Sequence, residues 1–96
     1  MFVRLSRMEG KPELLSDAIP AFQESTDSLQ TFPGFEGGYL MADRETGTIV
    51  TFTLWHSKAD RDNSADNADG ILARTASKAG ASGVASVEAF EVFLEV

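Results

Sequence analysis

Apolar and polar positions alternate along four stretches of the chain, and alternation with a period of two residues is typical of β-strands. The stretches cover residues 2–8, 35–42, 48–56 and 84–96. The second and third are separated by Asp43–Gly47, a polar loop of hairpin length whose glycine permits a positive φ. The sequence therefore predicts four strands, of which the middle two form a hairpin.

Between the first two strands, apolar residues recur at steps of three and four, the period of an amphipathic helix. This segment begins at Pro12, a residue favoured in the first turn of a helix, and ends before Pro33. Pro20 lies inside it, lacks an N–H and clashes with the carbonyl of Ser16. We expect a kink at Pro20 in preference to two shorter helices.

A second helix is predicted directly after the third strand. It begins at Ser57, whose hydroxyl can accept a hydrogen bond from the backbone N–H of Asp60. Gly70 weakens its middle, and it ends before a flexible connection at residues 80–83. Its predicted buried stripe consists of Ala68, Ile71, Leu72, Thr75 and Ala79.

The order of these elements, β-α-β-β-α-β, predicts a ferredoxin-like α+β fold in a single domain over residues 1–96. Such a fold has an antiparallel four-stranded sheet with two helices on one face. The third strand is apolar on both sides: Ile49, Thr51, Thr53 and Trp55 share one face, and Val50, Phe52, Leu54 and His56 share the other. Because two helices cover only one face, we expect the other to pack against a second copy of the chain, giving a homodimeric α+β barrel.

Composition narrows the partners and the compartment. The formal net charge of −7 argues against binding to nucleic acid or to an anionic membrane, because both require basic patches. The chain has no cysteine, which removes disulfides, thiolate nucleophiles and cysteine-ligated metals. No apolar segment approaches the length of a membrane span. We therefore expect a soluble cytoplasmic protein with no nucleic-acid or membrane partner.

Three segments carry a family resemblance: FPGFEGGY at Phe32–Tyr39, the turn Asp43–Gly47, and LWHS at Leu54–Ser57 followed by a helix. Together they resemble the antibiotic biosynthesis monooxygenase-type domains of the dimeric α+β barrel superfamily, and the order of elements matches over nearly the whole chain. The resemblance implies a cofactor-independent monooxygenase acting on a small aromatic, phenolic or quinol compound. The superfamily also includes haem-degrading enzymes, isomerases and small proteins without established activity. A non-catalytic dimeric barrel that binds a small apolar ligand, or has a structural role, is therefore the alternative.

Trp55, Tyr39 and His56 are the candidates for catalysis. The resemblance implies that a tryptophan at the strand end lies near the pocket. If Trp55 and Tyr39 share the face without helices, they form an aromatic wall with an indole N–H and a phenol O–H as donors. The alternative for both is a packing role in the core or the interface. His56 is the only histidine, the residue type best suited to acid–base chemistry at neutral pH, but its strand-end position also suits a surface or helix-side contact.

Six residues are candidates for binding the substrate: Arg4, Ser6, Thr51, Thr53, Phe35 and Phe93. Arg4 would anchor an anion if it lay inside an apolar barrel, and is otherwise an ordinary surface charge. Some catalytic relatives place an asparagine on the face of Thr51 and Thr53. In the non-catalytic alternative, Phe35, Phe93 and Phe90 interdigitate across the dimer interface. The enzyme hypothesis requires a mainly apolar cavity, and a filled cavity would contradict it.

We expect neither a metal nor a cofactor. One histidine cannot build a multi-histidine site, and the acidic run Asp60–Asp69 lacks the spacing of a calcium loop, so it forms a solvated helix face or a lid. The haem-degrading branch typically supplies its axial histidine from the second helix. This chain has no histidine between Ser57 and Gly80, which argues against haem degradation by that route.

Overall fold

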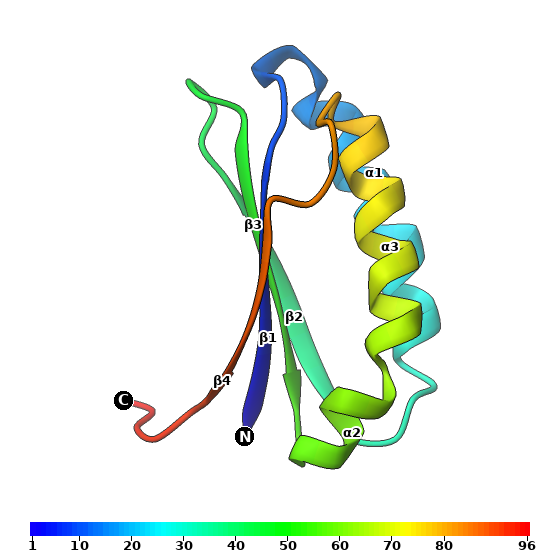
Figure 1. Cartoon of the computed structure of the whole chain (residues 1–96), viewed down its shortest axis with the longest axis vertical. Helices are drawn as coiled ribbons and strands as arrows, with labels where there is room; N and C mark the ends of the chain where they lie inside the picture. Colours follow the sequence, from blue (N-terminus) through cyan, green and yellow to red (C-terminus); the bar gives the residue numbers. More distant parts are fainter.

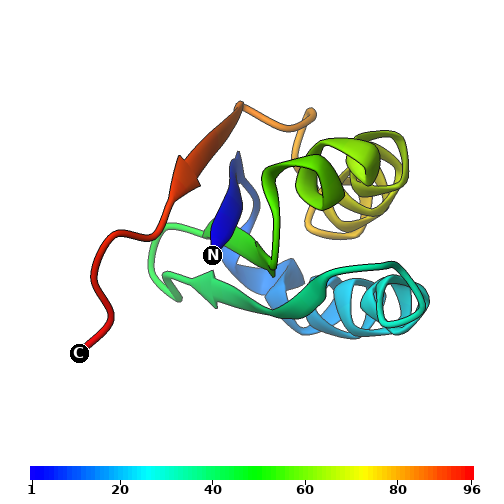
Figure 2. The same cartoon turned by 90° about the horizontal axis from the view of Figure 1, so that it is seen from below.

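A four-stranded antiparallel sheet runs through the centre of the computed structural model, which describes residues 1–96 with the exception of the side chain of Ala68. The strand order is β2-β3-β1-β4. The strands are β1 (Phe2–Glu9), β2 (Phe35–Ala42), β3 (Thr48–Trp55) and β4 (Ser86–Glu91). The helices all lie on one side of this sheet (Figures 1 and 2). The predicted ferredoxin-like α+β fold is confirmed.

The first helical segment begins with a 3₁₀ turn at Pro12–Leu14 and continues as α1 (Leu15–Leu29). It passes through Pro20 without dividing there, so the alternative of two shorter helices at this proline is wrong. Pro20 and Ser16 are both exposed, so water can reach the carbonyl of Ser16 that loses its helical partner.

The second helical segment is divided into α2 (Lys58–Asn63) and α3 (Ala65–Lys78), whereas one helix was predicted. Ser57 caps α2 as expected, since its hydroxyl accepts a hydrogen bond of 3.0 Å from the N–H of Asp60. The division falls at Ser64, whose hydroxyl donates to the carbonyl of Arg61 at 2.7 Å. This bond occupies a carbonyl at the end of α2, and the chain turns into α3.

The core lies between the helices and the two central strands. Met8 of β1 and Ile49 of β3 lie opposite each other in the register and are fully buried. Around them pack Leu15, Ala18, Leu72, Ala76 and Ala79 from the helical layer. Of the predicted α3 stripe, Leu72, Thr75 and Ala79 are buried and Ile71 is half-buried, while the side chain of Ala68 lies outside the described part.

The helix-facing side of β3 is the one that carries Trp55. Ile49, Thr51, Thr53 and Trp55 are all buried under the helices. The condition for an aromatic wall of Trp55 and Tyr39, a shared helix-free face, is therefore not met. A β-bulge in β2 places Tyr39 on the face opposite Trp55. Phe35 pairs with Trp55, but Gly37 pairs with Leu54, so the side chains of β2 change faces between Phe35 and Gly37. Phe35 points toward the helices and Tyr39 away from them, contrary to simple alternation.

The other face of the sheet, which we call the open face, has no element over it (Figure 2). Its side chains are mainly apolar and half-buried or exposed: Val3, Leu5, Tyr39, Met41, Val50, Phe52, Leu54 and Phe90. A monomer rarely leaves an apolar row of this kind in water. Among the described residues, no helix is both long and apolar enough to cross a membrane.

The last strand is shorter than the predicted residues 84–96. β4 ends at Glu91 because its partner β1 begins at Phe2, and one further hydrogen bond joins the N–H of Val92 to the carbonyl of Met1. Beyond it the chain projects away from the sheet (Figure 1). Phe93 is 89% exposed in this segment, so it does not lie on the sheet face where it was predicted.

The hairpin loop gives a test of the fold. Gly47 has a φ of +81°, and a Cβ there would collide with the carbonyl of Gly10. We expect Gly47→Ala to lower the free energy of unfolding by at least about 1–2 kcal/mol, measured by urea denaturation. Gly70→Ala in α3 is the control, because a Cβ added at Gly70 would meet no atom within 4 Å beyond its own helix turn. It should raise the free energy of unfolding by about 0.5–1 kcal/mol. Equal effects of the two substitutions would contradict the loop geometry.

Candidate functional site

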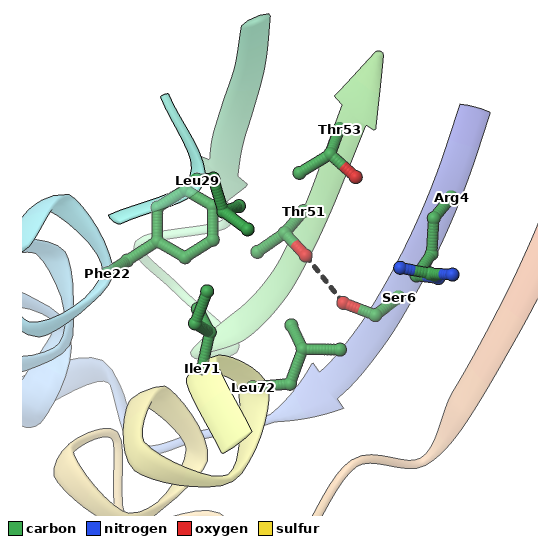
Figure 3. A pocket seen from close by; sticks show the side chains of 8 residues that line it. All are labelled: Arg4, Ser6, Phe22, Leu29, Thr51, Thr53, Ile71 and Leu72. Carbon is green, nitrogen blue, oxygen red and sulfur yellow. Dashed lines mark hydrogen bonds between the residues drawn. The ribbon is translucent and has the colours of Figure 1, made fainter. Parts of the chain in front are cut away.

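A small cavity lies between the sheet and the helices, and its two walls differ in chemistry (Figure 3). The strands contribute the polar wall, which consists of Arg4, Ser6, Thr51 and Thr53. The helices contribute the apolar wall, which consists of Phe22, Leu29, Ile71 and Leu72. The cavity holds about 20 Å³, room for roughly one water molecule and far below a typical ligand pocket. The four predicted polar residues thus meet at one place, although on the helix side of the sheet.

A pair of buried hydroxyls occupies the middle of the polar wall. Ser6 and Thr51 are opposite each other on β1 and β3, and their side-chain oxygens are hydrogen-bonded (Figure 3). Both residues are almost completely buried. Because each hydroxyl can donate one bond and accept others, this pair can present either a donor or an acceptor to the cavity.

Arg4 forms the charged end of the polar wall. Its guanidinium donates to the hydroxyl of Ser64 at 3.0 Å and to the carbonyl of Arg61 at 2.6 Å. Among the described residues, no carboxylate forms an ion pair with it. Burial lowers the pKa of Arg4; the nearby charge of Asp69 acts in the opposite direction, Arg61 lowers the pKa further and Asp62 raises it. Arg4 is therefore a half-buried cation held by neutral acceptors.

Arg61 is a second arginine at this corner, and the sequence interpretation placed it on a solvated face. Only 7% of it is exposed. It contacts Asp62 at 3.1 Å, donates to the carbonyl of Phe90 at 3.3 Å and lies over the ring of Phe2. A signal for its burial existed, because Arg61 and Ser64 extend the stripe of Leu72 toward the N-terminus at helical steps.

Trp55 packs in the core beside the site and does not line the cavity. Its exposed fraction is 0%, and its ring meets that of Phe35 edge-on with a centroid distance of 5.3 Å. Its indole N–H donates to the hydroxyl of Thr53 at 2.9 Å. The indole donor is thus already used, and the contact orients a hydroxyl that does line the cavity.

The remaining candidates lie apart from the cavity. Tyr39 is 59% exposed on the open face and packs against Phe52. The side chain of His56 is 80% exposed, with its Nδ1 3.9 Å from a carboxylate oxygen of Glu36. Phe93 belongs to the projecting C-terminal segment. The structure therefore gathers the four strand residues of the predicted set and separates these three from them.

The hydroxyl pair can be tested by a double-mutant cycle. Thr51→Val and Ser6→Ala each leave the partner hydroxyl buried without its bond, so each should cost about 1–3 kcal/mol of unfolding free energy. The double variant removes both groups, and we expect it to cost less than the sum by about 1 kcal/mol. Chemical denaturation of the four proteins measures the difference. Strictly additive effects would show that the two hydroxyls do not interact.

No protein-family model matches the chain, and no curated protein matches it in sequence. Solved structures match over nearly its whole length. MhuD, a haem degrader from Mycobacterium tuberculosis solved with two haems bound in its active site, has a TM-score of 0.74 at 22% identity, covering 100% of this chain and 99% of MhuD. A proposed antibiotic biosynthesis monooxygenase from Chloroflexus aurantiacus J-10-fl has a TM-score of 0.69 at 12% identity, covering 99% and 95%.

Rv0793 from Mycobacterium tuberculosis is similar to the same degree, with a TM-score of 0.69 at 14% identity over 98% of this chain and 96% of that protein. Identities this low establish the architecture and leave the chemistry to the residues of the site. The chain has the ferredoxin-like α+β fold of the antibiotic biosynthesis monooxygenase-type proteins.

Proposed function

We propose that this chain is a cofactor-independent monooxygenase that takes a small phenolic or quinol compound between its helices and its sheet. The observation that carries the proposal is the cavity with one polar and one apolar wall. A flat aromatic ring suits the wall formed by Phe22 and Leu29, and its oxygen suits the guanidinium and hydroxyls opposite (Figure 3). The fold shared with a proposed antibiotic biosynthesis monooxygenase is consistent with this assignment.

The residues of the polar wall support a division of roles. Arg4 stabilises the negative charge on the substrate's phenolic oxygen. The ionised ring is richer in electrons and therefore more reactive toward molecular oxygen. Ser6 and Thr51 orient that oxygen, and Trp55 acts as a positioning residue through its bond to Thr53. None of the eight side chains around the cavity is a carboxylate or an imidazole. We therefore assign removal of the substrate's hydroxyl proton to water, with the positive charge of Arg4 stabilising the oxygen that loses it.

Substrate entry requires movement, because a cavity of about 20 Å³ cannot hold an aromatic ring. Ile71 marks the route: it lines the cavity and also a groove of about 400 Å³ on the surface between α1 and α3. One exposed ion pair crosses from helix to helix there, between Arg74 and Glu24 at 2.8 Å. An exposed ion pair of this kind contributes little stability, so it does not prevent α1 and α3 from moving apart.

Haem does not fit the residues of this cavity, although MhuD binds it. Haem iron takes an axial ligand from histidine, cysteine, methionine or tyrosine. The cavity is lined by none of these, and His56 lies on the surface. We therefore derive no step through haem.

We also propose that the chain works as a homodimer whose partner is a second copy packed against the open face. The apolar residues of this face lie in adjacent strands and include the exposed Tyr39, Met41 and Phe90. Two such faces are complementary to each other about a twofold axis. The C-terminal segment that carries Phe93 and Leu94 projects beyond the edge strand β4 and adds further apolar surface there.

The second candidate function is a dimeric barrel without turnover, and the small size of the cavity favours it. In that case the polar wall is only a set of internally satisfied groups. The two candidates differ in one observable, the consumption of oxygen in the presence of a quinol.

Oxygen uptake with naphthohydroquinone, corrected for autoxidation without protein, is the test of the proposed function. We expect the wild-type protein to accelerate uptake and Ile71→Phe to reduce this acceleration by about tenfold or more, because the larger ring fills the route. Ile19→Phe is the matched control, since Ile19 is exposed on α1 and does not line the cavity. No acceleration by the wild-type protein would favour the non-catalytic barrel.

The dimer is tested by sedimentation. Phe90→Asp places a charge on the open face and should convert the dimer to a folded monomer, whereas Ile19→Asp on the outside of α1 should leave the dimer intact. A wild-type protein that sediments as a monomer at micromolar concentration would refute the proposed assembly.

A further inference from the structure

A second hollow opens at the end of the helical layer, where the loop after α1 meets the corner between α2 and α3 (Figure 1). Its volume is about 250 Å³, far larger than that of the cavity over the sheet. We call it the Asp60 hollow, and the residues that line it are Phe32, Pro33, Asp60, Asn63, Ser64 and Asn67. None of them lines the cavity, so the hollow is a space of its own.

Asp60 carries the only charge among the residues that line the hollow. Its backbone is fixed by Ser57, whose hydroxyl accepts from the N–H of Asp60 at 3.0 Å. Its carboxylate lies so close to Gly34 that a Cβ on this glycine would collide with it. Among the described residues, no side chain forms an ion pair or a hydrogen bond with this carboxylate. No unbonded side-chain oxygen in the described part is fully buried, so the oxygens of Asp60 are open to an incoming donor.

Two amides extend this set of acceptors. Asn63 and Asn67 follow Asp60 at steps of three and four residues, so the three side chains lie on one side of the helical segment and line the same hollow. Each amide oxygen accepts hydrogen bonds, and three acceptor side chains match the three N–H donors of a primary ammonium group. Phe32 and Pro33 form the apolar side of the hollow, where an aromatic ring attracts a cation and packs against its alkyl chain.

The charges near the hollow also favour a cation. Arg61 pairs with Asp62 at 3.1 Å, so these two charges largely cancel. Lys58 is two residues before Asp60, a spacing at which helical side chains do not face each other. Asp66 on α3 is exposed and adds negative charge. An anionic ligand would thus be repelled, and a single carboxylate is too few for a calcium site.

We propose that the Asp60 hollow binds the primary ammonium group of a small aliphatic amine. The ammonium donates to the Asp60 carboxylate and to the amide oxygens of Asn63 and Asn67, and the alkyl chain packs on Phe32. The bond to the carboxylate is charge-assisted and contributes most to the affinity. The inference does not rest on the monooxygenase or on the homodimer, because the hollow lies outside both the cavity and the open face.

An NMR titration with butylammonium chloride at neutral pH and constant ionic strength tests this site. We expect the side-chain amide signals of Asn63 and Asn67 to shift and to saturate at millimolar probe. Asp60→Asn keeps the shape but removes the charge, so it should weaken binding by about tenfold or more. Asp27→Asn is the matched control, since Asp27 is exposed on α1 and the substitution removes the same charge. It should bind the probe as the wild-type protein does.

Asn67→Ala keeps the proposal testable if Asp60→Asn does not fold. Asn67 is exposed on α3 and alanine is the better helix former, so this variant should fold. It removes one acceptor from the hollow, and we expect the affinity for butylammonium to fall by about threefold or more, measured from the shifts of Asn63.

Three further probes separate a hydrogen-bonded ammonium from other occupants. Butanol has a similar size without the charge, and tetramethylammonium has the charge without an N–H donor. We expect each to bind at least about tenfold more weakly than butylammonium. A lysine blocked by acetyl and methylamide groups presents the same ammonium on a peptide backbone, and it should bind no more tightly than butylammonium. Tighter binding would show that the occupant is a protein side chain and would overturn the assignment to a small amine.

The result that supports the inference is a saturable shift at the hollow that is lost in Asp60→Asn and retained in Asp27→Asn. Three results overturn it: no shift in the wild-type protein, equal binding by Asp60→Asn, or equal binding of tetramethylammonium. Because the probe does not react with oxygen and does not enter the cavity, each result stands whatever the oxygen uptake shows.

Discussion

Two helices can cover only one face of a four-stranded sheet, and the rest of the molecule is arranged around that limit. The covered face belongs to alternate residues of β1 and β3, which run from Met8 and Ile49 at one end, through Arg4 and Thr53, to Phe2 and Trp55 at the other. The uncovered face retains an apolar row that water solvates poorly. One limit thus places the core and the cavity on one side of the sheet and an uncovered apolar face on the other.

Polarity changes along the covered face, from an apolar packed core at one end to the partly polar cavity further along. At one end, Met8 and Ile49 pack against the small residues Ala18, Ala76 and Ala79, which lets the helices approach the sheet closely. Toward the other end, short hydroxyl side chains on the strands face long apolar side chains on the helices, and the gap between them is not quite filled. The cavity is the consequence of pairing short polar residues with a helical layer.

Strand and helix periodicity was sufficient to predict the element order, the sheet and most of the α3 stripe, and the Ser57 hydroxyl three residues before Asp60 was sufficient to predict the cap. It could not assign faces, because β3 is apolar on both sides and alternation does not say which side the helices take. It also could not place Phe35, since a bulge between Phe35 and Gly37 reverses the sides of β2 without a distinctive residue pattern. The end of β4 depends on where its neighbour β1 begins, which is information outside the segment itself.

The candidate site was predicted in part for a related reason. Arg4, Ser6, Thr51 and Thr53 were found because residues on facing strands at two-residue steps must point to one side, wherever that side lies. Arg61 was missed because its neighbours Asp60, Asp62 and Asn63 make the segment look solvated, while its own position belongs to the buried stripe. Tyr39 and His56 were chosen for their chemistry, and the bulge and the strand end put them elsewhere.

Stability alone does not account for the charged end of this face. A guanidinium that is half-buried and bonded to neutral acceptors loses hydration, and the lowered pKa of Arg4 expresses that loss, which the nearby charges of Asp69 and Asp62 offset only in part. An apolar side chain at this position would continue the packing of Met8 and avoid the cost. Acidic side chains are abundant in a chain of net charge −7, yet among the described residues none forms an ion pair with Arg4. A cation held beside a cavity at some expense of stability, with no carboxylate bonded to it, is therefore compatible with the proposed binding of a phenolic oxygen.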